Sequence, residues 1–416
     1  MKILVLNCGS SSIKYQLIEM EEGGSVTASD VLDDRLIAKG IVERIGLDRA
    51  DLTQHADGKE KVTVSKQVAN HQEGVQWVLE YLMHPTHGVI KDVSEISAAG
   101  HRVAHGGETF KKSTLITPKV MEELRKTVSL APLHNPANIK GIESISAVLP
   151  SIPQVAVFDT SFHQSMPDYA YMYAIPYRYY EEHKIRRYGF HGTSHKFVVE
   201  KAAEFYGLDY GSAKIISCHL GNGASIAAVV GGRSVDTSMG YTPVEGLVMG
   251  TRAGDIDAGV VFDIMRNEGL TADEASDVFN RQSGLQGISG LSSDMRDLNA
   301  AASAGNDRAR LALDMFAYRV KKYIGAYAAA MGGVDVILFT GGIGENDFVI
   351  RARICKGLEF MGAVLDVRRN DGLRGVDTDL TADGSRVKIC LMTTNEELVI
   401  ARETETIVNC QLSIVN

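Results

Sequence analysis

The chain has 416 residues, of which 44% are hydrophobic and 23% are charged, a composition typical of globular proteins. The formal net charge of −9 comes without any block of Lys or Arg, which argues against a nucleic-acid-binding protein. No apolar run reaches the roughly eighteen residues of a membrane span, so we expect no membrane association.

Length and cysteine usage add two expectations. A chain of this size exceeds the point at which a single hydrophobic core stops growing, which predicts two domains. The five cysteines are scattered without metal-ligand spacing. Such an odd, scattered set is typical of reduced thiols and predicts a cytoplasmic protein.

The amino terminus predicts a β-hairpin with a polar turn. An apolar run at residues 3–6 leads into the turn at residues 7–12, and residues 13–17 alternate as a second strand. Turn amides and hydroxyls of this kind can bind an anion, because successive N–H groups form a nest. An ordinary hairpin without a ligand is the alternative.

Further along the chain, strand-like and helix-like stretches alternate, which predicts an α/β fold. The predicted strands cover residues 96–105, 154–158, 214–219, 334–340 and 387–392, and the predicted helices cover residues 74–83, 121–128 and 308–331. Pro150 and Pro153 break a structured region and predict the crossing between two domains. The tail after Glu403 has no clear periodicity, and no element is predicted there.

Two histidine pairs, His101 with His105 and His191 with His195, have the His-x-x-x-His spacing of some zinc sites. Zinc is disfavoured, because the metalloprotease glutamate is missing and no third ligand is evident. The first pair also follows a strand, where residues four apart lie about 13 Å apart. Histidines hydrogen-bonded to backbone are the alternative for His101, His105 and His195.

Arg102 and Arg252 stand among glycines rather than on helix faces. A guanidinium in such a place can fork onto a phosphate or a carboxylate. A surface salt bridge is the competing interpretation for each arginine.

The middle of the chain repeats the plan of the amino terminus. The apolar run 215–220, a Gly-containing turn and the resumed run 226–229 follow about two hundred residues later, which predicts a duplicated domain. The strand predicted at 334–340 ends in Gly341, Gly342 and Gly344. Such a turn at the carboxyl edge of a sheet commonly binds phosphate or ribose, although a tight connection without a ligand is equally consistent.

Several unusual motifs occur in one order along the chain, at residues 7–14, 100–108, 158–164, 187–195, 219–223, 236–240, 249–255, 340–346 and 394–397. Together they resemble the signatures of acetate kinases. The resemblance implies two duplicated actin-like (ribonuclease H-like) domains with an interdomain cleft. It places the N-terminal domain at 1–160, completed by a helix at 397–416, and a nucleotide-binding C-terminal domain at 161–396.

The resemblance also implies the activity. It predicts reversible phosphoryl transfer between ATP and acetate by direct in-line attack, giving acetyl phosphate and ADP, with Mg²⁺ (or Mn²⁺) and a homodimer. A propionate kinase is the alternative, and GTP or pyrophosphate stays open as the donor. Other classes within this fold are a chaperone ATPase, which needs a peptide-binding extension that this sequence does not show, and a filament-forming protein.

Roles can be carried over to matching positions. Arg102 and Arg252 resemble the pair that grips the acyl carboxylate and the migrating phosphoryl group, and His191 resembles the hydrogen-bond donor to the transition state. Asp159 and Glu396 resemble the acidic residues that place the metal. The predicted metal-binding residues are Asn7 and Glu396. Residues 394–397 also form a capping-box pattern that would open the last helix, so Glu396 has a structural alternative.

The remaining positions bind nucleotide and substrate in the family pattern. The nucleotide set is Asn7, Ser10, Ser12, Lys14, His219, Leu220, Gly221, Asn222, Gly223, Asp294, Met295, Arg296, Gly341, Gly342, Ile343, Gly344 and Asn346. Lys14 has solvent as its alternative. The substrate set is Arg102, Ala104, Leu133, Phe190 and Pro243. Ala104 replaces the Val of many acetate kinases and is similar to propionate kinases at this position.

Overall fold

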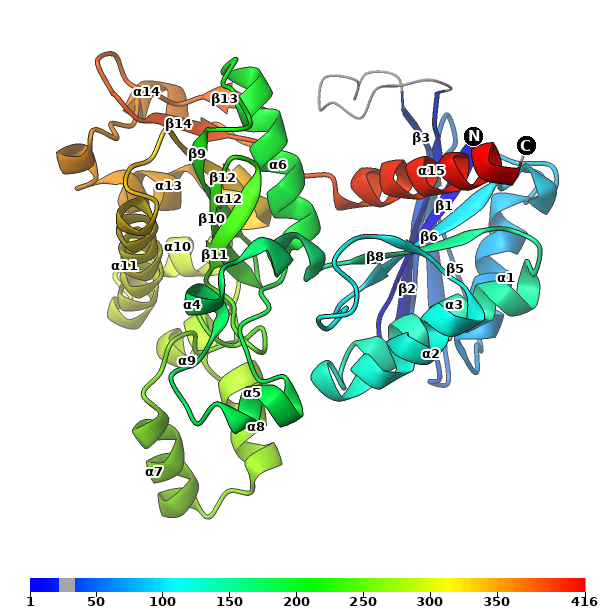
Figure 1. Cartoon of the computed structure of the whole chain (residues 1–416), viewed down its shortest axis with the longest axis horizontal. Helices are drawn as coiled ribbons and strands as arrows, with labels where there is room; N and C mark the ends of the chain where they lie inside the picture. The colour runs from blue at the N-terminus through cyan, green and yellow to red at the C-terminus, as the bar shows by residue number, and fades with distance from the viewer. Residues whose placement is uncertain (22–33, 416) are drawn as a thin grey trace. The chain divides into compact units, whose positions relative to one another are not determined.

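The computed structural model describes residues 1–21 and 34–415, with side chains described to residue 411. It divides into two compact units (Figure 1). The first unit comprises Met1–Phe162 and Asn395–Asn416, and the second comprises His163–Thr394. The crossing predicted at Pro150 and Pro153 is wrong. Both prolines lie inside the first unit, between helix α3 (Asn135–Val148) and strand β8 (Gln154–Phe158), where they end a helix and precede a strand because they lack an N–H.

The first unit is built on an eight-stranded sheet in the order β5-β4-β3-β2-β1-β6-β8-β7. Strands β1 to β5 pair antiparallel, and β1, β6 and β8 pair parallel. The other strands are β1 (Lys2–Cys8), β2 (Ser12–Glu19), β3 (Arg35–Glu43), β4 (Ala50–Ala56), β5 (Val62–Lys66), β6 (Ala98–Val103) and β7 (Thr114–Leu115).

Helices cover both faces of this sheet. Leu4 and Leu6 of β1 pack with α1 (His71–Leu82) and α3, whereas Ile3 and Val5 pack with α15 (Glu396–Val415) on the opposite face (Figure 1). Successive strand side chains point to opposite faces, so an uninterrupted apolar run is what a two-sided core requires. The short elements are α2 (Pro118–Lys126), η2 (Val93–Glu95) and η3 (Thr127–Leu130).

The second unit is built on a six-stranded sheet in the order β11-β10-β9-β12-β14-β13. Its strands are β9 (Lys214–Leu220), β10 (Ala224–Val230), β11 (Arg233–Thr237), β12 (Val336–Thr340), β13 (Thr378–Asp379) and β14 (Lys388–Leu391). Its helices are α4 (Asp168–Tyr171), α5 (Arg178–His183), α6 (Gly192–Phe205), α7 (Ala258–Glu268), α8 (Ala272–Arg281), α9 (Gly284–Ser289), α10 (Met295–Ser303), α11 (Asp307–Ala330), α12 (Gly341–Asn346), α13 (Phe348–Cys355), α14 (Val367–Asn370), η4 (Ser161–Ser165) and η5 (Glu359–Met361).

The two sheets share one plan. The order β3-β2-β1-β6-β8 of the first unit corresponds to β11-β10-β9-β12-β14 of the second. In both, an antiparallel hairpin is flanked by a third antiparallel strand on one side and two parallel strands on the other. The repeated sequence pattern therefore corresponds to a repeated strand arrangement.

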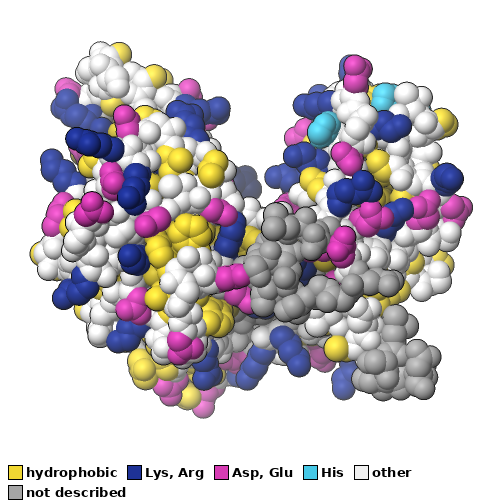
Figure 2. Space-filling model, turned by 90° about the horizontal axis from the view of Figure 1, so that it is seen from above, with side chains coloured by type: hydrophobic (Ala, Val, Ile, Leu, Met, Phe, Trp, Pro, Cys, Tyr) yellow, Lys and Arg dark blue, Asp and Glu magenta, His cyan; other side chains and the backbone are white. Residues whose placement is uncertain are grey.

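Two further features concern the surface charges and the length and hydropathy of the helices. On the face that Figure 2 displays, Lys and Arg side chains lie among Asp and Glu side chains rather than in one block. Over residues 1–21 and 34–415, no helix is both long and apolar enough to cross a membrane. The tail after Glu403, where periodicity predicted no element, continues α15 to Val415, in agreement with the helix at 397–416 that the resemblance implied.

Candidate functional site

The predicted anion-binding turn joins β1 to β2 in the first unit. It is tight, because the Gly9 N–H donates to the Ser12 carbonyl at 2.8 Å and a Cβ on Gly9 would lie 2.9 Å from Ser12 Oγ. Ser10 is exposed, while Asn7 and Ser12 are half-buried. Their polar groups therefore remain accessible along a turn whose backbone is held in place.

Arg102, Asp159 and Glu396 meet in the first unit. An Nη of Arg102, at the end of β6, donates to Asp159 Oδ2 at 2.7 Å, and Arg102 Nε lies 3.8 Å from Glu396 Oε2. Parallel pairing of β6 with β8 explains this meeting, since both strands end at the same edge. Among the described residues, the buried Nε of Arg102 finds no hydrogen-bond acceptor. A buried donor left in this state favours an anionic ligand.

The charges in this group perturb each other. The carboxylate of Asp159 raises the pKa of Arg102, although burial opposes it. Burial raises the pKa of Glu396 to about 7, and the positive charge of Arg102 opposes that rise. Lys14 also lowers the pKa of Glu396, so its exposed side chain acts on this group from β2 rather than pointing only to solvent.

The predicted capping box at residues 394–397 is wrong. The cap of α15 is Asn395, whose Oδ1 accepts from the Leu398 N–H at 3.1 Å. Thr394 is engaged elsewhere, with its hydroxyl 2.8 Å from Ser194 Oγ and its N–H donated to Glu345. Asn is a strong N-cap residue, so it takes the role that the pattern assigned to Thr394. Glu396 is thus left in the first helical turn without a capping duty.

Two members of the predicted acyl pocket lie in the first unit. Ala104 is buried just after β6, and its N–H donates to Asn138 Oδ1 at 3.0 Å. Asn138 Nδ2 donates to the Cys8 carbonyl at 2.9 Å. Asn138 therefore ties together the ends of β1 and β6, a role that sequence reasoning missed. Leu133, in contrast, is 63% exposed before α3.

In the second unit, His191 occupies the N-cap position of α6 with a left-handed φ of +57°. Such a backbone is rare for residues other than glycine and tends to occur at functional sites. Its Nδ1 lies 2.9 Å from Ser225 Oγ, and its ring stacks on His219 at 4.3 Å. His219 Nδ1 in turn lies 2.8 Å from Ser194 Oγ.

The glycine loop at residues 221–223 brings His191 and Arg252 together. A Cβ on Gly223 would lie 3.3 Å from an Nη of Arg252 and 3.6 Å from His191 Nε2. A Cβ on Gly250 would lie 1.8 Å from Asn222 Oδ1, so Asn222 packs directly against the loop that carries Arg252. The absence of side chains on these glycines leaves space beside a guanidinium and an imidazole edge.

Arg252 lacks an acidic partner in the part of the chain that the structure describes. Its Nη1 lies 3.8 Å from the Met249 sulfur, and burial alone lowers its pKa. A largely buried guanidinium without a carboxylate is costly unless an anion completes it. The surface salt bridge proposed as the competing interpretation is absent there. For Arg102 both interpretations apply. Its guanidinium forms a salt bridge with Asp159, and its Nε–H remains available to an anionic ligand.

The glycine turn after β12 is also tightly built. A Cβ on Gly341, whose φ is +76°, would lie 2.8 Å from the Leu220 carbonyl, whereas Gly342 has nothing within 4 Å. One carboxylate oxygen of Glu345 accepts from Thr340 Oγ1 at 3.2 Å, Gly341 N at 3.0 Å and Thr394 N at 3.1 Å. Sequence reasoning missed Glu345, which holds this turn in place.

The other predicted residues of the second unit have varied surroundings. Asp294 caps α10 by accepting from the Arg296 N–H at 2.8 Å and pairs with the Arg296 side chain at 2.6 Å. Phe190 and Met295 are buried, and Pro243 is half-buried on the connection between β11 and α7. Asn346 is exposed and donates to the Gly342 carbonyl at 3.0 Å.

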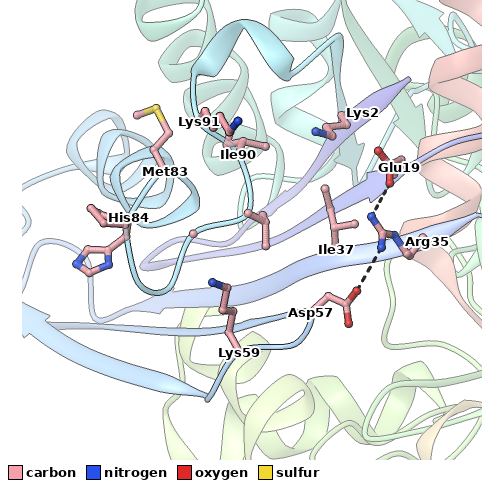
Figure 3. Close-up of a pocket in the computed structure, with 13 residues that line it drawn as sticks. Lys2, Glu19, Arg35, Ile37, Asp57, Lys59, Met83, His84, Ile90 and Lys91 are labelled. Atoms are coloured by element: carbon pink, nitrogen blue, oxygen red, sulfur yellow. Dashed lines mark hydrogen bonds and ion pairs between the residues drawn. The ribbon is translucent and has the colours of Figure 1, made fainter.

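A cavity of about 590 Å³ in the first unit contains none of the predicted residues (Figure 3). Arg35 pairs with Glu19 and Asp57, and Lys2 pairs with Glu95 outside the cavity lining, while Lys59 and Lys91 are exposed to solvent. Its cations are therefore either paired or exposed to solvent, unlike the largely buried Arg252, and we do not regard this cavity as the functional site.

The chain is similar to known proteins over nearly its whole length. Residues 2–402 match the model of the acetokinase family. The acetate kinase of Caldanaerobacter subterraneus subsp. tengcongensis is 55% identical over 98% of this chain and 99% of the relative. The crystal structure of Porphyromonas gingivalis acetate kinase superposes with a TM-score of 0.92 at 49% identity, covering 98% of this chain and 99% of that one. A propionate kinase from Francisella tularensis has a TM-score of 0.88 at 41% identity, covering 97% and 99%. The two-sheet α/β fold predicted from sequence is confirmed.

Proposed function

The chain belongs to the acetokinase family, whose members are phosphotransferases with a carboxyl group as acceptor, and on this premise we propose that it transfers a phosphoryl group reversibly between ATP and acetate. The observation that carries the proposal is Arg252, a largely buried cation without an acidic partner among the described residues, beside His191 at an open glycine loop. An anionic phosphoryl group is the chemical complement of that arrangement.

The proposed reaction is a direct in-line displacement. An acetate oxygen forms a bond to the γ-phosphorus of ATP, the bond from that phosphorus to the bridging oxygen breaks, and ADP leaves. Arg102 holds the acetate carboxylate, while Arg252 and His191 stabilise the charge on the equatorial oxygens. No general base is needed, because a carboxylate of pKa near 4 is already ionised at neutral pH.

The oxygen donors of the first unit fit Mg²⁺. Asp159 and Glu396 supply carboxylate oxygens and Asn7 supplies an amide oxygen. In the described residues, no group of three or more His, Cys, Asp or Glu side chains forms a metal cage. Mg²⁺ suits such a site, since it usually keeps several waters and uses one or two carboxylates, with Mn²⁺ as the alternative. When bound, the ion would neutralise phosphate charge.

The test is an acyl hydroxamate assay of the purified protein with acetate, propionate and butyrate, each with ATP, GTP or pyrophosphate. We expect acyl phosphate with acetate and ATP. Failure to form acyl phosphate from every pair would refute the proposal. Sedimentation with ATP then separates the filament-forming alternative, which would pellet.

A cytoplasmic location is part of the proposal. Cys8, Cys218, Cys355 and Cys390 are buried thiols outside any disulfide. Burial raises the pKa of the Cys8 and Cys355 thiols to about 12, which keeps them in the unreactive protonated form. Such thiols suit a reducing compartment.

Propionate is the second candidate substrate, and Ala104 favours it. Its small side chain leaves room for one more methylene, worth about 0.8 kcal/mol when buried, although pockets discriminate weakly on this scale. We expect propionate to be used within about tenfold of acetate in kcat/KM. Ala104→Val should lower kcat/KM for propionate more than for acetate. If the ratio of the two constants stays unchanged, Ala104 does not line the acyl pocket.

A homodimer is also proposed, because α7 is a largely apolar helix that, among the described residues, packs mainly against α8. None of its residues is buried, and Val260 and Phe262 are 43% and 59% exposed. In Figure 1, α7 contacts its own unit mainly through α8. Exposed apolar surface of this kind marks an interface, and a second copy of the chain is the occupant that we propose.

Phe262→Glu should therefore dissociate the dimer. Placing a carboxylate in an apolar interface is expected to raise the dimer dissociation constant at least about 30-fold, the loss typical of one hot-spot residue. Sedimentation velocity over a concentration series measures this shift. Phe360→Glu is the matched control, since Phe360 is 82% exposed in the same unit. A monomeric wild type, or equal dissociation in both variants, would exclude α7 as the interface.

A further inference from the structure

His195 is a buried histidine whose ring bridges two serines. Its Nδ1 lies 2.8 Å from Ser217 Oγ on β9, and its Nε2 lies 2.7 Å from Ser225 Oγ on β10. Ser225 Oγ also lies 2.9 Å from His191 Nδ1. Hydrogen bonds thus run without a break from Ser217 through His195 and Ser225 to His191. We call Ser217, His195 and Ser225 the histidine relay.

Counting protons limits the relay to two arrangements. Burial lowers the pKa of His195 well below its ordinary value, so the ring is neutral and carries one N–H. In the first arrangement His195 donates from Nε2 to Ser225, and Ser225 donates to His191 Nδ1. In the second, His195 donates from Nδ1 to Ser217, Ser225 donates to His195 Nε2, and Ser225 accepts from His191. Every hydrogen bond is kept in both.

The two arrangements correspond to two charge states of His191. In the first, Nδ1 accepts a hydrogen bond, so a neutral His191 carries its proton on Nε2. In the second, Nδ1 is protonated, and His191 can carry protons on both nitrogens. The relay reverses direction to accept the additional N–H, and no buried polar group loses its partner, which would otherwise be costly.

We propose that the histidine relay lets His191 act as an imidazolium, by accepting its Nδ1–H while Nε2–H faces the phosphoryl group. This inference rests on the proposed phosphoryl transfer. Ser217, His195 and Ser225 are positioning residues, since they act through His191. An imidazolium places a full positive charge where a transferring phosphoryl group spreads negative charge.

Arg252 and His219 are neighbours of His191 in the second unit. The guanidinium of Arg252 lies beside the same glycine loop, and the His219 ring stacks on His191 at 4.3 Å. The His163 ring meets His195 edge-on at 5.7 Å. Neither Arg252 nor a histidine supplies negative charge. A bound phosphoryl group would add negative charge beside Nε2–H, while the relay supplies the acceptor for Nδ1–H.

The test makes two measurements. NMR follows the titration of His191 in the uncomplexed protein, and steady-state kinetics follow the alkaline limb of the profile of kcat against pH. Ser225→Ala removes the direct acceptor of Nδ1–H. Ser217→Ala leaves Ser225 in place but removes the acceptor that His195 needs when the relay reverses. In both variants, the His191 midpoint and the alkaline limb should move down by about one pH unit or more, because one buried donor loses its acceptor.

Ser234→Ala is the matched control. It removes another buried serine hydroxyl, which lies 2.8 Å from His163 Nδ1 and takes no part in the relay. Its His191 midpoint should stay at the wild-type value.

Within the relay, Ser217 is linked to His191 only through His195 and Ser225. An unchanged His191 midpoint in Ser217→Ala would therefore overturn the proposal. If Ser225→Ala fails to fold, Ser217→Ala still decides. A protein without acyl kinase activity would refute the proposed function, while the NMR titration would still test the relay.

Discussion

Replacing Arg252 with Ala is expected to lower kcat by at least about 100-fold, the scale for losing one preorganised charge donor. We expect the same loss for Arg102→Ala. Both guanidinium groups are largely buried, and each keeps donor capacity that no described residue uses. Steady-state kinetics with acetate and ATP measure the effect. Lys in either place should remain poor, because an ammonium cannot reproduce the two-pronged contact of a guanidinium.

The two arginines should differ in their effects on stability. Removing Arg252 takes away a cation without an acidic partner, so the melting temperature should change little. Removing Arg102 leaves the Asp159 carboxylate, which accepts at 2.7 Å, buried without its cation, so a clear loss of stability is expected. Arg310→Ala serves as the control, since Arg310 pairs with Asp307 on the exposed surface and is not itself a predicted site residue. Near-normal turnover in Arg102→Ala or Arg252→Ala would remove that residue from the mechanism.

The elements that sequence predicted best are those whose signal is local. The hairpins at β1–β2 and β9–β10 follow from apolar runs interrupted by polar, glycine-containing turns. The carboxyl-terminal helix was predicted only through the family resemblance and not from periodicity, although Ile400, Ala401 and Val408 are buried at helical spacing. Thr404 interrupts that stripe. It is fully buried and donates its hydroxyl to the Ile400 carbonyl, a contact that composition alone does not reveal.

The residues that sequence missed share a different property. Asn138 joins the Cys8 carbonyl and the Ala104 N–H, which lie 130 and 34 residues away in the chain. Glu345 joins its own turn to Thr394, 49 residues away. Such side chains act by satisfying buried backbone groups, whose positions follow from the tertiary fold. Arg102 and Arg252 were found because a cation among glycines carries a chemical signal in the sequence itself.

Glu396 combines the predicted metal role with an unusual protonation state. Burial raises its pKa from 4.5 to about 7. Between these values the folded protein binds more protons than the unfolded chain, so the free energy of unfolding falls as the pH rises through this window. Glu396→Gln removes that dependence. As the pH rises from about 5 to about 8, the melting temperature of the variant should therefore increase relative to that of wild type.

Mg²⁺ binding should strengthen as the pH rises, whereas the free energy of unfolding falls. A proton on Glu396 competes with Mg²⁺, so the Mg²⁺ concentration that gives half-maximal activity in wild type should fall as the pH rises through about 7. Glu396→Gln should need at least about tenfold more Mg²⁺ and should lose this pH dependence. Mutating a residue that only hydrogen-bonds to a metal ligand already lowers metal affinity by about that factor. Activity against Mg²⁺ concentration at several pH values measures both effects.

Asn395→Ala separates the metal role from helix capping at the neighbouring position. Asn395 is the residue that caps α15, so its loss should cost about 0.5–2 kcal/mol of stability and leave the Mg²⁺ titration unchanged. Glu396→Gln keeps the cap and should show the reverse pattern. The metal assignment fails if Glu396→Gln titrates like wild type with Mg²⁺ at every pH. In that case Glu396 would serve only as a buried partner of Arg102, whose Nε lies 3.8 Å away.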